Sequence, residues 1–164
     1  MRVIMRPLLT FLFCLPLLSS AGIRWVEVGV DGLTCSMCSR SVEMSIKRLH
    51  FVDSVAMSLE TTDGKVFLKP GQPVDLKKIA RAITDAGFSV RFVRIHMDFD
   101  DVTVGSDGSF VYQGQPFVWM DFKGPESSAT LQLLDEGFLP RKEVADWKKK
   151  MTPSSKKIFH VAQM

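Results

Sequence analysis

The sequence has 164 residues, and it is poor in the side chains that most metal centres and many enzymes use. It contains three cysteines and three histidines. No nucleophile–base pair and no pair of carboxylates stands at a spacing useful for catalysis, so we expect no enzymatic activity. Apolar residues make up 46% of the chain and charged residues 24%, which is typical of a folded globular protein.

Long apolar runs are also scarce, and the one candidate lies at the start of the chain. Arg2 and Arg6 precede an apolar stretch over 7–18, and Ser19-Ser20-Ala21 then supplies small residues. This pattern is typical of a secretory signal peptide over residues 1–21, cleaved near Ala21. A membrane anchor is the alternative, but the run is shorter than the roughly 20 residues of a spanning helix. We therefore expect an extracytoplasmic protein, periplasmic or secreted, with no stable membrane span after cleavage.

Cleavage would also leave little excess of charge. Without Arg2 and Arg6 the chain keeps 19 basic and 18 acidic residues, a net charge of +1. A general attraction to nucleic acid is therefore not expected. The basic run Lys148-Lys149-Lys150, continued by Lys156-Lys157, predicts a solvated helix face that suits an acidic partner or an anionic membrane surface.

Two cysteines remain after cleavage, because Cys14 lies in the signal peptide. They occupy the stretch Gly32-Leu33-Thr34-Cys35-Ser36-Met37-Cys38, between a strand-like alternation over 23–30 and a helical pattern over 37–50. The first N–H groups of a helix lack partners and favour negative charge, so both thiol pKa values should fall. A thiolate binds metal or attacks a disulfide. The pattern therefore predicts Cys35 and Cys38 as the functional residues.

The surrounding pattern predicts a complete small domain. Alternating apolar residues predict strands over 23–30, 55–59, 66–68 and 88–92, and helical spacing predicts helices over 37–50 and 75–83. Thr62-Asp63-Gly64 predicts the turn of a hairpin. The order strand, helix, strand, strand, helix, strand is the ferredoxin-like βαββαβ arrangement, with two helices on one face of an antiparallel sheet.

Residues 97–164 carry a different pattern. Short strand-like runs occupy 99–104, 109–112, 117–122, 130–134 and 157–163, and apolar spacing predicts one helix over 140–151. We therefore predict an α+β protein with three parts. These are a signal peptide (1–21), a ferredoxin-like domain (22–96) and a small antiparallel β module with one helix (97–164).

Residues 23–95 resemble the heavy-metal-associated domain of copper chaperones, copper-transporting ATPases and periplasmic mercury-binding proteins. The family's Gly-Met-Thr-Cys-x-x-Cys corresponds to residues 32–38, and its closing Ala-Gly-Phe/Tyr corresponds to Ala86-Gly87-Phe88. The resemblance implies that Cys35 and Cys38 are metal ligands, that Leu33 packs beneath the loop in place of the family's Met, and that Phe88 lies near the site. No Asp precedes Cys35, so the pattern preferred for zinc in this family is absent.

The chemistry of the ligands also bears on the ion. Thiolates prefer Cu(I), Zn(II) and other soft ions, whereas a structural zinc site takes four ligands. Only two cysteines remain after the expected cleavage, and no nearby histidine has ligand spacing with them. We expect Cu(I), with Hg(II), Zn(II) or Cd(II) as alternatives. Such a site suits transfer to a protein partner, buffering or detoxification.

Three alternatives remain open. A Cys-x-x-Cys at a helix start also serves thiol–disulfide oxidoreductases, although their usual Trp-Cys-Gly-Pro-Cys is absent here. The pair could also be idle or disulfide-bonded in a structural or interaction protein. Finally, a second metal site is conceivable at His96-Met97, at His160 with Met164 or at Trp119-Met120, where packing is the commoner explanation.

Overall fold

The computed structural model describes residues 22–124, 126–151 and 158–164. The predicted signal peptide, Cys14 and Lys156-Lys157 lie outside these residues. The elements follow in the order β1 (Gly22–Asp31), α1 (Ser36–Lys47), β2 (Val52–Ser58), β3 (Asp63–Leu68), α2 (Leu76–Asp85), β4 (Ser89–Asp98), β5 (Ser109–Tyr112), β6 (Gln115–Trp119), β7 (Ser128–Leu133), α3 (Arg141–Lys148) and β8 (Phe159–Gln163). None of the helices in these ranges is long and apolar enough to cross a membrane.

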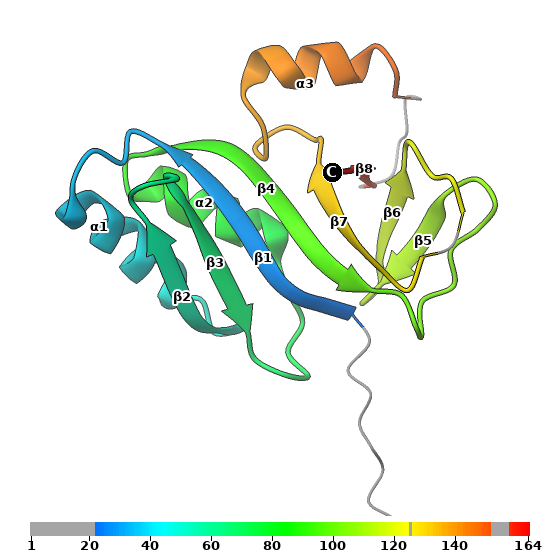
Figure 1. Cartoon of the computed structure of the whole chain (residues 1–164), viewed down its shortest axis with the longest axis horizontal. Coiled ribbons are helices and arrows are strands. Elements are labelled where there is room, and N and C mark those ends of the chain that lie inside the picture. The colour runs from blue at the N-terminus through cyan, green and yellow to red at the C-terminus, as the bar shows by residue number, and fades with distance from the viewer. Residues whose placement is uncertain (1–21, 125, 152–157) are drawn as a thin grey trace, which may run out of the picture.

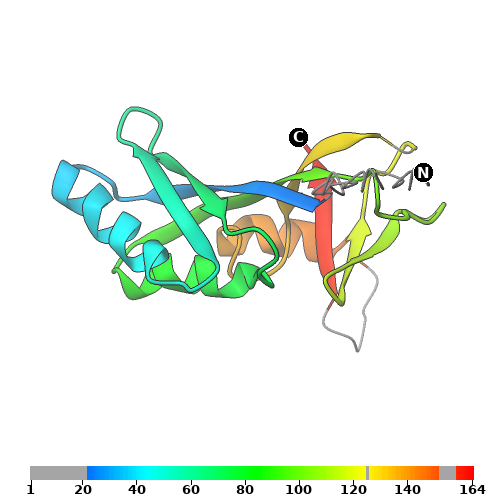
Figure 2. The ribbon, with the colours of Figure 1, turned by 90° about the horizontal axis from the view of Figure 1, so that it is seen from below.

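The first half of the chain has the predicted ferredoxin-like fold. Its strands lie in the order β2-β3-β1-β4, and every neighbouring pair is antiparallel. Helices α1 and α2 lie on the same side of this sheet (Figure 2). The arrangement places the end of β1 and the start of α1 together at one end of the sheet (Figure 1).

The core of this half comes from side chains at strand and helix periodicity. Alternate residues of β1 point toward the helices, and one stripe of each helix points back toward the sheet. The fully buried members are Val26, Val28, Val30, Val42, Ile46, Ile79 and Ile83. Burying each such aliphatic side chain contributes about 1.5–3 kcal/mol to the free energy of unfolding. This packed layer therefore fixes the position of the loop between β1 and α1.

The hairpin between β2 and β3 turns earlier than predicted. Residues 59–62 form the turn, and Thr62 takes the positive φ, at 53°. Asp63 and Gly64 are the first residues of β3, and Gly64 pairs with Met57. A Cβ on Gly64 would overlap the Met57 sulfur. Gly64 therefore allows close packing between two strands of the sheet. The Asp-Gly sequence had instead predicted that Gly64 lies in the turn.

The second half extends the same sheet. The full strand order is β2-β3-β1-β4-β7-β8-β6-β5, so β4 pairs with β1 on one side and β7 on the other (Figure 1). Strand β4 continues past residue 96 to Asp98. The predicted module of strands with one helix is present, and α3 ends at Lys148, three residues before the predicted end.

Two details of the second half differ from the prediction. Strands β6 and β8 run parallel, whereas the other pairs of this half are antiparallel. They are not joined by a hairpin, so no turn forces them to run in opposite directions. The predicted strand over 99–104 is also absent, because Val102 donates a backbone hydrogen bond to Phe99 and closes a turn (3.0 Å).

Candidate metal centre

The loop between β1 and α1 is shaped by Gly32 and Leu33. Gly32 has a φ of 89°, a conformation that residues with a Cβ rarely adopt. Leu33 is only 5% exposed and packs into the core, as expected for the residue in the place of the family's Met. Anchored by this leucine, the loop presents the next four residues, 34–37, to solvent.

Cys35 and Cys38 lie together in the first turn of α1. Cys35 has extended backbone geometry (φ −151°, ψ 161°) and is the N-cap of the helix. Its Sγ accepts a hydrogen bond from the backbone N–H of Cys38, with a sulfur–nitrogen distance of 3.2 Å. Both thiols are free, Cys35 is exposed and Cys38 is half-buried. The two predicted ligands thus share one accessible corner of the domain.

The same turn lowers the pKa of the Cys38 thiol. The largest cause is the hydrogen bond with the side chain of Cys35. Backbone and side-chain hydrogen bonds involving Thr34 act in the same direction, and burial opposes them. A lowered pKa raises the fraction of thiolate at neutral pH, the form that binds soft metals. The role of Thr34 was not predicted, and its position directly before the first cysteine was the only available signal.

Two apolar side chains, Phe88 and Met37, accompany the cysteines at this end of the domain. Phe88 lies against the loop, because its Cδ1 would be 3.6 Å from a Cβ placed on Gly32. Met37, between the cysteines, is 75% exposed. In the part of the chain that the structure describes, no three His, Cys, Asp or Glu side chains form a group that could hold a metal ion.

The weaker candidate ligands lie elsewhere and have other partners. His96 Nδ1 is hydrogen-bonded to Thr130 Oγ1 (2.9 Å), and its ring stacks on Trp25 at 4.4 Å between centroids. His160 Nδ1 is hydrogen-bonded to Asp135 Oδ1 (2.8 Å). Met97 and Trp119 are buried. The structure brings none of these residues to the two cysteines.

The site lies in a region that matches a known family. The model of the heavy-metal-associated domain matches residues 27–89. The copper chaperone CopZ of Bacillus subtilis is 39% identical over 62 residues, which are 37% of this chain and 87% of the chaperone. A match over most of a relative's length at this identity shows the family. The chain belongs to the heavy-metal-associated domain family.

Other relatives match the same region. The copper-transporting ATPase RAN1 of Arabidopsis thaliana is 34% identical over 73 residues, 44% of this chain and 7% of the ATPase. The chain thus spans less than a tenth of the curated ATPases it matches. Among solved structures, a copper-binding domain from HMA7, a P-type ATPase, is 33% identical and covers 44% of this chain and 93% of its own, with a TM-score of 0.38. Oxidized MerP from Ralstonia metallidurans CH34 is 29% identical, with coverages of 40% and 90% and a TM-score of 0.37.

Proposed function

We propose that this chain binds Cu(I) through the thiolates of Cys35 and Cys38, outside the cytoplasm, and passes the ion to a protein partner. The observation that carries the proposal is the shared helix turn, where Cys35 caps the N–H of Cys38 and the pKa of Cys38 is lowered. Such a turn holds two soft ligands together at the surface. The protein then acts as a carrier and not as a catalyst.

The choice of Cu(I) follows from ligand number and softness. Two thiolates satisfy an ion that accepts two ligands, whereas Zn(II) in proteins usually takes four. No third His, Cys, Asp or Glu joins the pair among the described residues. Hg(II) and Cd(II) share the softness of Cu(I) and remain the alternative ions. Two relatives named above, a copper chaperone and a copper-transporting ATPase, also favour copper.

Transfer is favoured over storage by the exposure of the site. An incoming thiolate can approach Cys35 from solvent, and a three-coordinate ion can then leave for the partner without unfolding of the donor. A closed site with four ligands would have to open first. The predicted signal peptide supports a location outside the cytoplasm, and the detection of a mature chain beginning near Gly22 would test it.

The test is anaerobic titration of the reduced mature protein with Cu(I) in competition with a chromogenic chelator. We expect one tightly bound Cu(I) per chain and loss of tight binding in the Cys35→Ser/Cys38→Ser variant. Met37→Leu is the matched control, because it removes the remaining sulfur of the loop and keeps an apolar side chain. Equal binding by the double variant, or an equal loss in the control, would refute the two-thiolate site.

A thiol–disulfide oxidoreductase is the alternative that shares the Cys-x-x-Cys. The lowered pKa of Cys38 would serve either chemistry, since the thiolate is also the nucleophile in disulfide exchange. Insulin reduction separates the two functions. A carrier should reduce insulin no faster than its Cys35→Ser/Cys38→Ser variant, whereas an oxidoreductase should lose its activity in that variant.

A further inference from the structure

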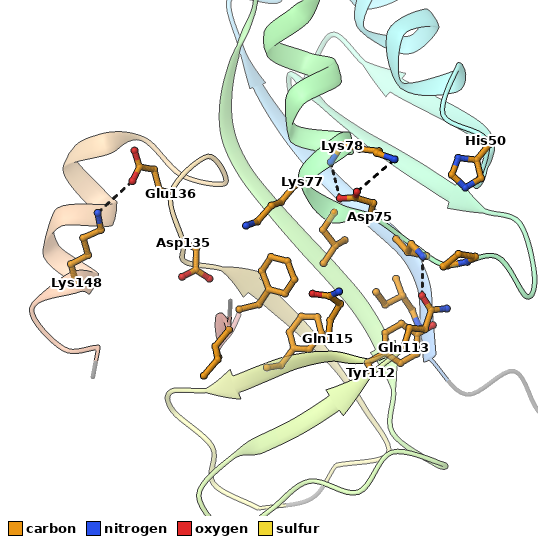
Figure 3. Close-up of a pocket in the computed structure, with 17 residues that line it drawn as sticks. His50, Asp75, Lys77, Lys78, Tyr112, Gln113, Gln115, Asp135, Glu136 and Lys148 are labelled. Carbon is orange, nitrogen blue, oxygen red and sulfur yellow. Dashed lines mark hydrogen bonds and ion pairs between the residues drawn. The ribbon is translucent and has the colours of Figure 1, made fainter. Parts of the chain in front are cut away.

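A cavity of about 620 Å³ lies where the metal-binding domain meets the C-terminal strands. Its walls come from the start of α2, the β5–β6 hairpin, the residues after β7 and the start of β8 (Figure 3). Small-molecule pockets typically measure about 300–1,000 Å³ and are common where two structural units meet. Neither cysteine lines this cavity, so it is separate from the proposed metal site.

The floor of the cavity is apolar. Leu76, Phe117 and Phe159 line it, and all three side chains are buried. The rings of Phe117 and Phe159 are in contact, with 5.2 Å between their centroids. A floor of this kind favours an aromatic or aliphatic body, because burial of apolar surface drives such binding.

One wall of the cavity is held in place by the side chain of Gln113, which we call the Gln113 clasp. Gln113 accepts a hydrogen bond from the backbone N–H of Val74 (2.8 Å) and donates one to the carbonyl of Gln72 (3.3 Å). Next to it, the hydroxyl oxygen of Tyr112 accepts from the backbone N–H of Ile23 (3.4 Å), so its own O–H can donate to another group. The Gln113 clasp joins the β5–β6 hairpin to the segment before α2 and keeps the cavity formed.

Each carboxylate that lines the cavity already has a partner. Asp75 caps α2 by accepting from the N–H of Lys78 (3.1 Å) and lies 3.8 Å from the Lys78 ammonium. Asp135 accepts from the backbone N–H of His160 (2.7 Å) and is hydrogen-bonded to its ring. Glu136 lies 3.5 Å from the ammonium of Lys148.

Lys77 differs from the other lysines of the cavity. Within the described ranges, no carboxylate oxygen lies within 4.0 Å of its ammonium, and the residues outside those ranges include no Asp or Glu. Its Nζ lies 5.6 Å from the centroid of the Phe159 ring (Figure 3). Lys77 also stands in the first turn of α2, where the helix dipole disfavours a cation.

We propose that this cavity binds a small organic anion with an aromatic or aliphatic body. The anionic group pairs with Lys77. The body lies against the accessible apolar part of the lining, to which the half-buried Val74 and Ile158 contribute. The three carboxylates already have partners, whereas Lys77 has no carboxylate within 4.0 Å in the described part of the chain, so an incoming anion can pair with Lys77 without displacing an existing ion pair.

The test compares two fluorescent probes with the same aromatic body. 1-Anilinonaphthalene-8-sulfonate carries an anionic group, and N-phenyl-1-naphthylamine is neutral. Both are titrated into the full mature protein and into Lys77→Gln. Lys78→Gln is the matched control, because the neighbouring lysine lines the same cavity but already pairs with Asp75. Both substituted lysines are exposed, so folding should be preserved.

We expect Lys77→Gln to weaken the sulfonate about fivefold to tenfold, as for the loss of one charge-assisted hydrogen bond. The neutral probe should change less than about twofold in either variant. Amide NMR shifts induced by the sulfonate should cluster at the start of α2 and in the β5–β6 hairpin. Absence of sulfonate binding, equal effects of the two variants, or shifts scattered over the surface would overturn the proposal.

Discussion

The cap of α1 allows the proposed metal role of Cys35 to be separated from its structural role. Its Sγ accepts from the N–H of Cys38, the third residue of the helix, which is the usual target of an N-cap side chain. Serine is among the preferred N-cap residues, whereas alanine provides no acceptor. Cys35→Ser should therefore preserve the cap while it removes the thiolate. Cys35→Ala should remove both.

The expected difference in stability is measurable. Loss of an N-cap acceptor costs about 0.5–2 kcal/mol, and a sulfur acceptor belongs at the lower end of that range. We expect Cys35→Ala to lower the free energy of unfolding of the metal-free protein by about 0.5–1 kcal/mol. Cys35→Ser should be as stable as the wild type or slightly more stable.

Urea denaturation of the reduced, metal-free proteins measures this difference. With a slope of about 2 kcal/mol per molar, the midpoint of Cys35→Ala should fall about 0.3–0.5 M below that of Cys35→Ser. Both variants should lose tight Cu(I) binding. If Cys35→Ser were the less stable of the two, or if it bound Cu(I) like the wild type, the assignment of cap and ligand would be wrong.

Three further predictions concern titration and boundaries. Cys35→Ala should raise the pKa of Cys38, because the hydrogen bond with the Cys35 side chain is the largest cause of the lowered pKa. The pH profile of iodoacetamide alkylation would measure the pKa of Cys38, and an unchanged profile would contradict the prediction. Burial lowers the pKa of His96. As pH drops below about 6.5, the unfolded state takes up the proton before the folded state does, so the free energy of unfolding should fall. Urea denaturation at several pH values should show this fall in the wild type and a smaller one in His96→Gln. A fragment from residue 22 to Asp98 should bind Cu(I) and resist urea better than one ending at His96. The shorter fragment lacks Asp98, which pairs with Gly22 of β1 and forms an ion pair with Arg24. Equal stability would show that the end of β4 contributes nothing.

The fold of the first half could be predicted because local patterns and tertiary packing agree there. Val26, Val28 and Val30 alternate in sequence and are fully buried in the structure, and Ile79 and Ile83 repeat at helical spacing and face them. The position of Cys35 and Cys38 at a helix start was predictable for the same reason. It depends on residues close in sequence, within one strand, one loop and one helix.

Features that depend on distant segments could not be predicted. The parallel pairing of β6 with β8 joins strands separated by β7 and α3, and no turn motif encodes it. The cavity needs α2, the β5–β6 hairpin and β8 to come together, so Lys77 carried no signal in the sequence. The pairing of β4 with β7 likewise has no local signature.

The attachment of the second half explains why the thiols remain accessible. Strand β7 pairs with β4 only from Arg94 to Asp98, next to the start of β1. The loop that carries Cys35 follows the other end of β1, where Asp31 pairs with Ser89. The ten residues of β1 separate these ends by roughly 30 Å, at about 3.3 Å per residue. The module therefore covers the Arg94–Asp98 part of an edge that a ferredoxin-like domain alone would expose, and it also packs against Phe92. Cys35, beyond the opposite end of β1, remains exposed.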